Sequence, residues 1–284
     1  MQIRLLALDL DGTLAWRGDE VLPATRAALH EAHACGIEVV IATGRRYRTT
    51  QRVVAALGLP VAAVCLGGAL VKDAAGGTLH QAVFAPADFQ AVAGIVRAHG
   101  EAPVAQRDAH GPDGGPDFLL DGAPAWNGAT SRYMEHNQEW AEWRRDLAAE
   151  AREDVLVVGA LGQREALEEA AEAIHQRFPG RFQSHVMPLP AERDNDGHYL
   201  EVAVGEVCKW TGLQHLAAHL GVPPEAICAV GDERNDLAMV ESAALGVAMG
   251  NAHPELLEVA DWVTGRHDED GIVAVVERIL TPAR

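Results

Sequence analysis

The run LLALDLDGTL, residues Leu5–Leu14, joins a short apolar segment to a pair of aspartates. The mostly apolar residues Ile3–Leu8 are typical of a strand that is covered on both faces of a parallel sheet. Side chains at positions i and i+2 of an extended chain point to the same side, so Asp9 and Asp11 are expected to face one site. Gly12 lets the chain turn away after them. Two carboxylates at the end of a strand favour a divalent-cation site.

Two other interpretations of this motif are an EF-hand calcium loop and an ordinary acidic turn. The EF-hand fails because its glycine would fall at Leu14, and because a buried strand instead of a helix precedes the loop. The acidic turn stays open at this point.

The chain around this motif alternates between runs typical of buried strands and runs typical of helices. Strands are predicted at 3–8, 37–42 and 62–66, and helices at 23–35 and 46–57. The alternation resumes with a helix at 209–220, a strand at 226–230 and a helix at 235–242. This pattern predicts an α/β fold, a doubly wound parallel-sheet (Rossmann-like) core with right-handed crossovers.

The segment between these two parts has a different character. After a predicted hairpin at 69–83, helices are expected near 86–99, 138–151 and 163–178, with strands near 155–159, 182–187 and 199–204. The 284 residues allow one large domain or two ordinary ones. We therefore expect a core domain formed by 1–83 and 205–284, interrupted by an inserted α+β domain at 84–204.

The composition and the apolar pattern indicate which kinds of binding partner and which cellular location to expect. A net charge of −18 argues against nucleic acid and anionic membranes as partners, so a bound phosphate would need a local binding device. No apolar stretch approaches the ~20 residues that span a bilayer. The N-terminal residues lack the pattern of a signal peptide. The four cysteines are scattered and three of them lie in apolar surroundings, which favours buried free thiols. A cytoplasmic protein is expected; the oligomeric state stays open.

Three further polar segments lie where strands end or helices begin. Thr43–Arg45 offers a hydroxyl and backbone N–H groups for an anion, although a threonine N-cap beside a solvated arginine face explains it as well. Lys209 is one of only two lysines against 21 arginines, and suits a point-charge contact to phosphate; a surface lysine is the alternative. Gly231–Asp236 (GDERND) supplies further carboxylates, or simply a helix-capping cluster.

The predicted topology brings these segments together. Asp9, Thr43 and Asp232 each follow a buried strand directly, and the carboxyl ends of parallel strands lie along one edge of the sheet. Carboxylates gathered there repel one another unless a cation neutralises them. Mg²⁺ and Lys209 together would meet that need, also for a bound phosphate.

In this order, the motifs resemble those of the haloacid dehalogenase superfamily, specifically its Cof-type (subclass IIB) phosphatases with a large α/β cap. Asp9–Leu14 is similar to the first motif, Thr43–Arg45 to the second, Lys209 to the third and Gly231–Asp236 to the fourth. Gly246–Ala252 (GVAMGNA) is similar to a segment typical of this branch. The resemblance covers essentially the whole chain and implies that the inserted domain is a cap.

The resemblance implies a Mg²⁺-dependent phosphomonoester hydrolase. Asp9 would be the nucleophile that forms an aspartyl-phosphate, and Asp11 the acid and base. Mg²⁺ would be held by the Asp9 carboxylate, the Asp11 main-chain carbonyl and Asp232, with Asp236 behind them. Further implied contacts are the phosphate-binding residues Leu10 (through its amide), Thr43, Gly44, Lys209 and Asn235, and Arg45 as a candidate substrate contact.

The leaving group stays open, with a small sugar phosphate as the favoured metabolite. A phosphomutase or phosphotransferase on the same scaffold is the alternative, and a non-catalytic metal-binding regulator a more remote one. Specificity would come from the cap, whose aromatic and histidine residues include Trp126, Tyr133, Trp140, Trp143, His110 and His136. The helical spacing expected for Trp140 and Trp143 favours packing in the cap core.

Overall fold

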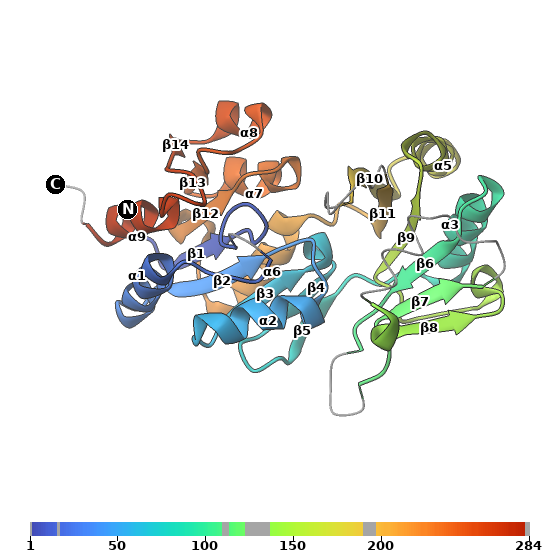
Figure 1. Ribbon diagram of the computed structural model, residues 1–284, viewed down its shortest axis with the longest axis horizontal. Helices are drawn as coiled ribbons and strands as arrows, with labels where there is room; N and C mark the ends of the chain where they lie inside the picture. Colours follow the sequence, from blue (N-terminus) through green and yellow to red (C-terminus); the bar gives the residue numbers. More distant parts are fainter. Residues whose placement is uncertain (1, 16–17, 110–113, 123–136, 190–196, 282–284) are drawn as a thin grey trace. The chain divides into compact units, whose positions relative to one another are not determined.

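The computed structural model describes residues 2–15, 18–109, 114–122, 137–189 and 197–281. It divides the chain into two compact units, one of Met1–Gln81 with Cys208–Arg284 and one of Ala82–Val207 (Figure 1). The predicted boundaries, after residues 83 and 204, lie two and three residues from these divisions. None of the helices in the described part of the chain combines the length and apolar character needed to cross a bilayer.

The first unit is built on an eight-stranded sheet in the order β14-β13-β12-β1-β2-β3-β4-β5. Neighbouring strands from β14 to β3 are parallel, whereas β4 and β5 extend the sheet as the expected antiparallel hairpin. The strands are β1 (Leu5–Leu8), β2 (Glu38–Ala42), β3 (Ala62–Cys65), β4 (Leu70–Lys72), β5 (Thr78–Gln81), β12 (Ile227–Gly231), β13 (Leu245–Ala248) and β14 (Trp262–Val263).

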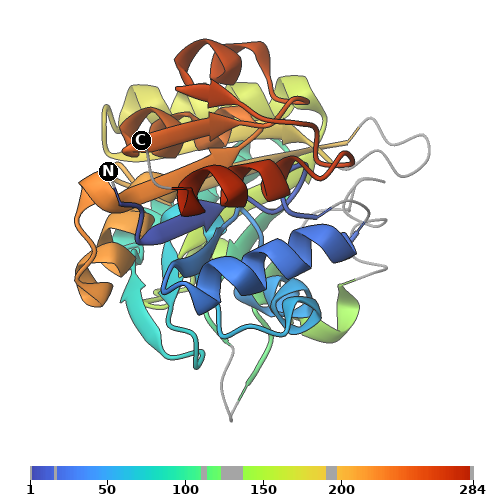
Figure 2. The same ribbon diagram turned by 90° about the vertical axis from the view of Figure 1, so that its left-hand side faces the viewer.

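Helices cover both faces of this sheet. Leu6 and Leu8 of β1 pack with α1, α2 and α9, whereas Leu5 and Ala7 point the other way and pack with α6, α7 and α8. Figure 2 shows part of the first layer, with α1 (blue) beside α9 (red). The helices are α1 (Pro23–Ala34), α2 (Tyr47–Leu57), α6 (Lys209–Leu220), α7 (Leu237–Ser242), α8 (Pro254–Val259) and α9 (Gly271–Leu280). The doubly wound α/β core is therefore confirmed.

The second unit contains a six-stranded sheet in the order β10-β11-β9-β6-β7-β8. Its strands pair antiparallel except for β7 and β8, and α3 and α5 share one hydrophobic core with one face of the sheet. The elements are α3 (Pro86–Ala98), β6 (Pro103–Gln106), β7 (Phe118–Asp121), β8 (Ala141–Arg144), β9 (Val157–Gly162), α5 (Arg164–Arg177), β10 (Phe182–Pro188) and β11 (His198–Val204).

The predicted helix at 138–151 is wrong. The structure has a 3₁₀ turn (Gln138–Trp140), the edge strand β8 and a second 3₁₀ turn (Leu147–Ala149). Pairing with β7 overrides the helical spacing of the tryptophans, and the side chain of Trp143 is 48% exposed, so it is not a core residue. Strands β6 and β7 were not predicted. Trp126, Tyr133, His110 and His136 lie outside the described residues.

The cysteines are free thiols, of which Cys65 and Cys228 are buried. Burial raises the pKa of the Cys228 thiol to about 12, which makes it unreactive. Cys35 is exposed and Cys208 half-buried, so only two of the four match the expected buried thiol.

Candidate active site

Three polar side chains lie at the carboxyl ends of neighbouring strands. Asp9 follows β1, Thr43 follows β2 and Asp232 follows β12, and β1 lies between the other two strands. The backbone N–H of Asp9 donates to the carbonyl of Val230 at 2.9 Å, so the sheet ladder still holds the chain at this point. The fold therefore delivers these three residues to one edge of the sheet, where ligands bind in open α/β folds.

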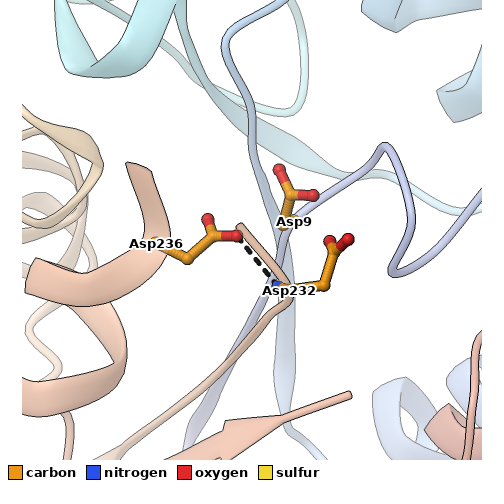
Figure 3. A group of neighbouring side chains, drawn as sticks. All are labelled: Asp9, Asp232 and Asp236. Atoms are coloured by element: carbon orange, nitrogen blue, oxygen red, sulfur yellow. Dashed lines mark hydrogen bonds between the residues drawn. The ribbon is translucent and has the colours of Figure 1, made fainter. Parts of the chain in front are cut away.

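Three buried carboxylates meet at this edge. Asp9, Asp232 and Asp236 each offer one oxygen, and these oxygens lie within 4.8 Å of one another (Figure 3). The exposed fractions of the three residues are 4%, 7% and 0%. Such a group is no ordinary acidic turn, since an acidic turn would leave its carboxylates in water.

Lys209, the first residue of α6, lies between these carboxylates. Its Nζ donates to Oδ1 of Asp9 and to Oδ1 of Asp236, each at 2.6 Å, and to Oδ1 of Asn235 at 3.2 Å. The residue is only 2% exposed, which excludes a surface lysine. Burial lowers the pKa of Lys209, but the carboxylates of Asp236 and Asp9 outweigh that effect and raise it, so the ammonium stays charged.

Asp236 shapes the loop that carries Asp232. Its Oδ2 accepts the backbone N–H groups of Asp232 and Glu233, each at 3.0 Å, and its Oδ1 accepts Lys209 (Figure 3 shows the bond to Asp232). Asp236 therefore ties the backbone of this loop to the ammonium of Lys209. The interpretation of Gly231–Asp236 as a capping cluster is thus correct for Asp236, which caps the backbone N–H groups of this loop.

The electrostatics of the group call for a further positive charge. Burial, together with the nearby Asp236 and Asp232, raises the pKa of Asp9 well above its usual range, although Lys209 opposes the shift. Burial also raises the pKa of Asp232, to about 6. Three carboxylates and one ammonium leave a net negative charge in a poorly solvated place, and a divalent cation with oxygen ligands fits that demand.

Asp11 is placed differently from Asp9. Its side chain is 62% exposed, and both its oxygens are bound by the guanidinium of Arg45, with Nε to Oδ2 at 2.8 Å. The same guanidinium also donates to Asp19 at 2.6 Å and to the Gly18 carbonyl at 3.2 Å. The Asp11 carboxylate is therefore held by Arg45 and is not part of the buried group of Asp9, Asp232 and Asp236. A metal contact through its main-chain carbonyl is unaffected by this.

Thr43–Arg45, the second motif, lies next to the buried carboxylates. Thr43 is 1% exposed and its Oγ1 accepts the backbone N–H of Arg45 at 3.1 Å. It is not a helix N-cap, because α2 begins only at Tyr47. A Cβ on Gly44 would lie 4.0 Å from Nδ2 of Asn235, so Gly44 faces that amide.

Leu10 is fully buried in the core beside α1, α2 and α9. Its side chain therefore anchors the loop that follows Asp9. Only its main chain is left to contribute to a site.

Three residues around Asp232 were not assigned from the sequence. Thr13 donates through Oγ1 to Oδ1 of Asp232 at 2.8 Å, and Asn251 donates to its Oδ2 at 3.3 Å. Gly12 has φ +85°, and a Cβ there would lie 2.2 Å from Oδ2 of Asp232. Gly12 and Thr13 belong to the first motif and Asn251 to the GVAMGNA segment. The motifs therefore indicate that these residues lie near the site, but they do not indicate the contacts with Asp232.

Replacing Gly12 by alanine is expected to weaken binding of a divalent cation at least ~10-fold, because the new methyl group must displace the Asp232 carboxylate. Gly36→Ala is the matched control: its φ is +84° and nothing lies within 4 Å of the added Cβ. Both variants should lose about 1–2 kcal/mol of unfolding free energy from backbone strain. Titration calorimetry with Mg²⁺ would separate them. Equal Mg²⁺ affinities in the two variants would contradict the role of this contact.

Comparison with known proteins identifies the family of this chain. The profile of the haloacid dehalogenase-like hydrolases matches residues 6–276. Phosphatase YwpJ of Bacillus subtilis (strain 168) is 28% identical over 293 residues, covering 98% of this chain and 100% of the relative. The 5-amino-6-(5-phospho-D-ribitylamino)uracil phosphatase YitU of the same strain is 30% identical over 287 residues, covering 98% and 97%. The crystal structure of TM0651 from Thermotoga maritima superimposes with a TM-score of 0.80 at 24% identity, covering 99% of each chain.

The profile match over residues 6–276 assigns this doubly wound core to a class of hydrolases. The chain belongs to the haloacid dehalogenase-like hydrolase family. Within it, the protein is a Cof-type phosphatase.

Proposed function

We propose that this protein is a Mg²⁺-dependent phosphomonoester hydrolase that acts on a small phosphorylated metabolite through an aspartyl-phosphate. The observation that carries the proposal is the buried Asp9 carboxylate, whose Oδ1 is bound by Lys209 at 2.6 Å. That contact orients the carboxylate and leaves Oδ2 as the atom that attacks.

In the first step, Oδ2 of Asp9 attacks phosphorus in line, and the bond from phosphorus to the ester oxygen breaks. Asp11 gives a proton to the departing oxygen. In the second step, a water molecule gives a proton to Asp11 and its oxygen attacks phosphorus, the bond between phosphorus and Oδ2 of Asp9 breaks, and inorganic phosphate leaves. Both oxygens of Asp11 are engaged by Arg45, so Asp11 must leave that ion pair to reach the ester oxygen.

The phosphate of the substrate would be bound by one positively charged group and several neutral hydrogen-bond donors around Asp9. Lys209 supplies the positive charge, and Asn235, Thr43, Gly44 and the Leu10 amide supply donors. Asn235 is exposed, with its Nδ2 facing Gly44, so the amide is accessible to a ligand.

Mg²⁺ would be held by the Asp9 carboxylate, the Asp11 main-chain carbonyl and Asp232. When bound, it would neutralise charge on the carboxylates and on the phosphate. Asp236 would act through Lys209 and through the backbone of Asp232, to which it is hydrogen-bonded.

For the substrate we favour a phosphorylated sugar or sugar alcohol. YitU is named for a phosphoribityl compound, and this chain matches it over nearly its whole length. The second unit, 82–207, would be the cap that selects the leaving group and keeps bulk water away while the phosphoryl group passes to Asp9.

Phosphate release from a panel of sugar phosphates, nucleotides and cofactor phosphates tests this proposal, with each compound assayed in Mg²⁺ and in EDTA. We expect release from a subset of compounds, with sugar phosphates ahead, and loss of nearly all activity in EDTA. Equal rates in EDTA would contradict the metal requirement. No release from any compound, together with exchange of label between sugar phosphates, would instead indicate a phosphotransferase.

A further inference from the structure

We infer that Asn251 and His267 are positioning residues for the cation site: Asn251 orients the Asp232 carboxylate, and His267 fixes the orientation of Asn251. The inference rests on the proposed function, because it assigns Asp232 to a bound cation. It extends that function to a residue in the loop after β13 and a residue in the loop after β14, neither of which is part of the four motifs.

Asn251 connects two segments that are distant in the sequence. Its Nδ2 donates to the Gly12 carbonyl at 2.9 Å and to Oδ2 of Asp232 at 3.3 Å. The loop after β1 is thereby tied to the loop after β12. Since Thr13 already binds Oδ1 of Asp232 at 2.8 Å, each oxygen of this carboxylate has its own donor.

The orientation of the Asn251 amide follows from its partners. Its Oδ1 accepts the backbone N–H of His267 at 3.0 Å, and a backbone nitrogen can only donate. On the other side, the Gly12 carbonyl can only accept, so Nδ2 must face it. The two sides independently require the same orientation of the amide, which removes the usual ambiguity between its oxygen and nitrogen.

The ring of His267 adds a second hold on the same oxygen. Its Nδ1 lies 3.1 Å from Oδ1 of Asn251, and because that oxygen is an acceptor, Nδ1 carries the hydrogen. The amide is therefore fixed by one backbone and one side-chain donor. Residues that hold a metal ligand in its binding orientation reduce the rearrangement needed when the ion arrives.

The test measures Mg²⁺ affinity by titration calorimetry, and the Mg²⁺-induced rise in melting temperature, for wild type, Asn251→Ala, His267→Ala and the double variant. We expect Asn251→Ala to weaken Mg²⁺ binding roughly 10–100-fold. His267→Ala should weaken it less, because the backbone N–H of His267 remains. The double variant should match Asn251→Ala alone, because His267 acts only through Asn251.

His253→Ala is the control, since its ring accepts the backbone N–H of Glu255 at 3.3 Å and caps α8. It should bind Mg²⁺ as the wild type does. If Asn251→Ala unfolds before binding can be measured, His267→Ala carries the test, because it leaves Asn251 in place.

Wild-type affinity in Asn251→Ala would overturn the inference and leave the proposed function standing. If the double variant bound Mg²⁺ more weakly than Asn251→Ala by the same factor that His267→Ala alone causes, His267 would not act through Asn251. If Mg²⁺ binding depended on Asn251 but the protein hydrolysed no phosphoester, the inference would be supported and the proposed function would be refuted. A wild-type protein that binds no Mg²⁺ would overturn both.

Discussion

Asp9→Asn is expected to lower phosphate release at least about a thousandfold, because an amide cannot form the covalent bond to phosphorus. The fold should persist. The Asn oxygen can still accept the hydrogen bond that Lys209 donates at 2.6 Å, and the change removes one charge from a group that has too many negative charges. Substrate binding should therefore remain measurable by calorimetry while turnover is lost.

The covalent step itself can be tested by quenching the reaction in acid. Wild type mixed with ³²P-labelled substrate should retain protein-bound label that hydroxylamine releases, as an acyl phosphate does, and Asp9→Asn should retain none. Glu168→Gln, on the exposed face of α5, removes one negative charge elsewhere and should label like the wild type. Activity above about a tenth of wild type in Asp9→Asn would refute the assignment of the nucleophile.

The sequence was sufficient to predict the core because its strands are buried on both faces. Residues 39–42 and 62–66 are continuously apolar, and the neighbouring helices begin at a proline or are followed by a glycine. Once the strands were placed, the topology alone brought Asp9 and Asp232 to one edge. Local pattern and tertiary structure agree in this part of the chain.

The second unit was harder to predict because pairing between distant strands decides it. The segment around Trp140 and Trp143 has a spacing compatible with a helix, yet it pairs as β8 with β7 at the edge of the sheet. Strand pairing depends on a partner that local periodicity does not reveal.

The sequence predicts which residues form the site better than it predicts which side chains contact one another. Asp11 shares a motif with Asp9, but an ion pair with Arg45, 34 positions along the chain, holds its side chain outside the buried group. Likewise, nothing in the local sequence of Asn251 indicates its bond to the carbonyl of Gly12. Side-chain partners of this kind follow from three-dimensional proximity, which a motif does not encode.

Lys209→Met should lower both activity and stability, each for a separate reason. Removing the ammonium leaves the Asp9 and Asp236 carboxylates without the cation that they share, and loss of one partner from a buried ion pair costs about 3–5 kcal/mol of unfolding free energy. The phosphate also loses a charged contact that would stabilise its transition state, for which we expect a rate loss of ~100–1,000-fold in saturating Mg²⁺.

The only other lysine in the chain provides a matched control for this variant. Lys72 is also buried, at 1% exposed, and its Nζ donates to Thr78 at 2.7 Å within the β4–β5 hairpin. Lys72→Met should therefore lose stability in denaturant titrations but keep its turnover number. Added Mg²⁺ should raise the melting temperature of Lys209→Met more than that of Lys72→Met, since a cation replaces part of the missing charge only in the first. If both variants lost stability and kept their turnover numbers, Lys209 would be a structural lysine with no part in the reaction.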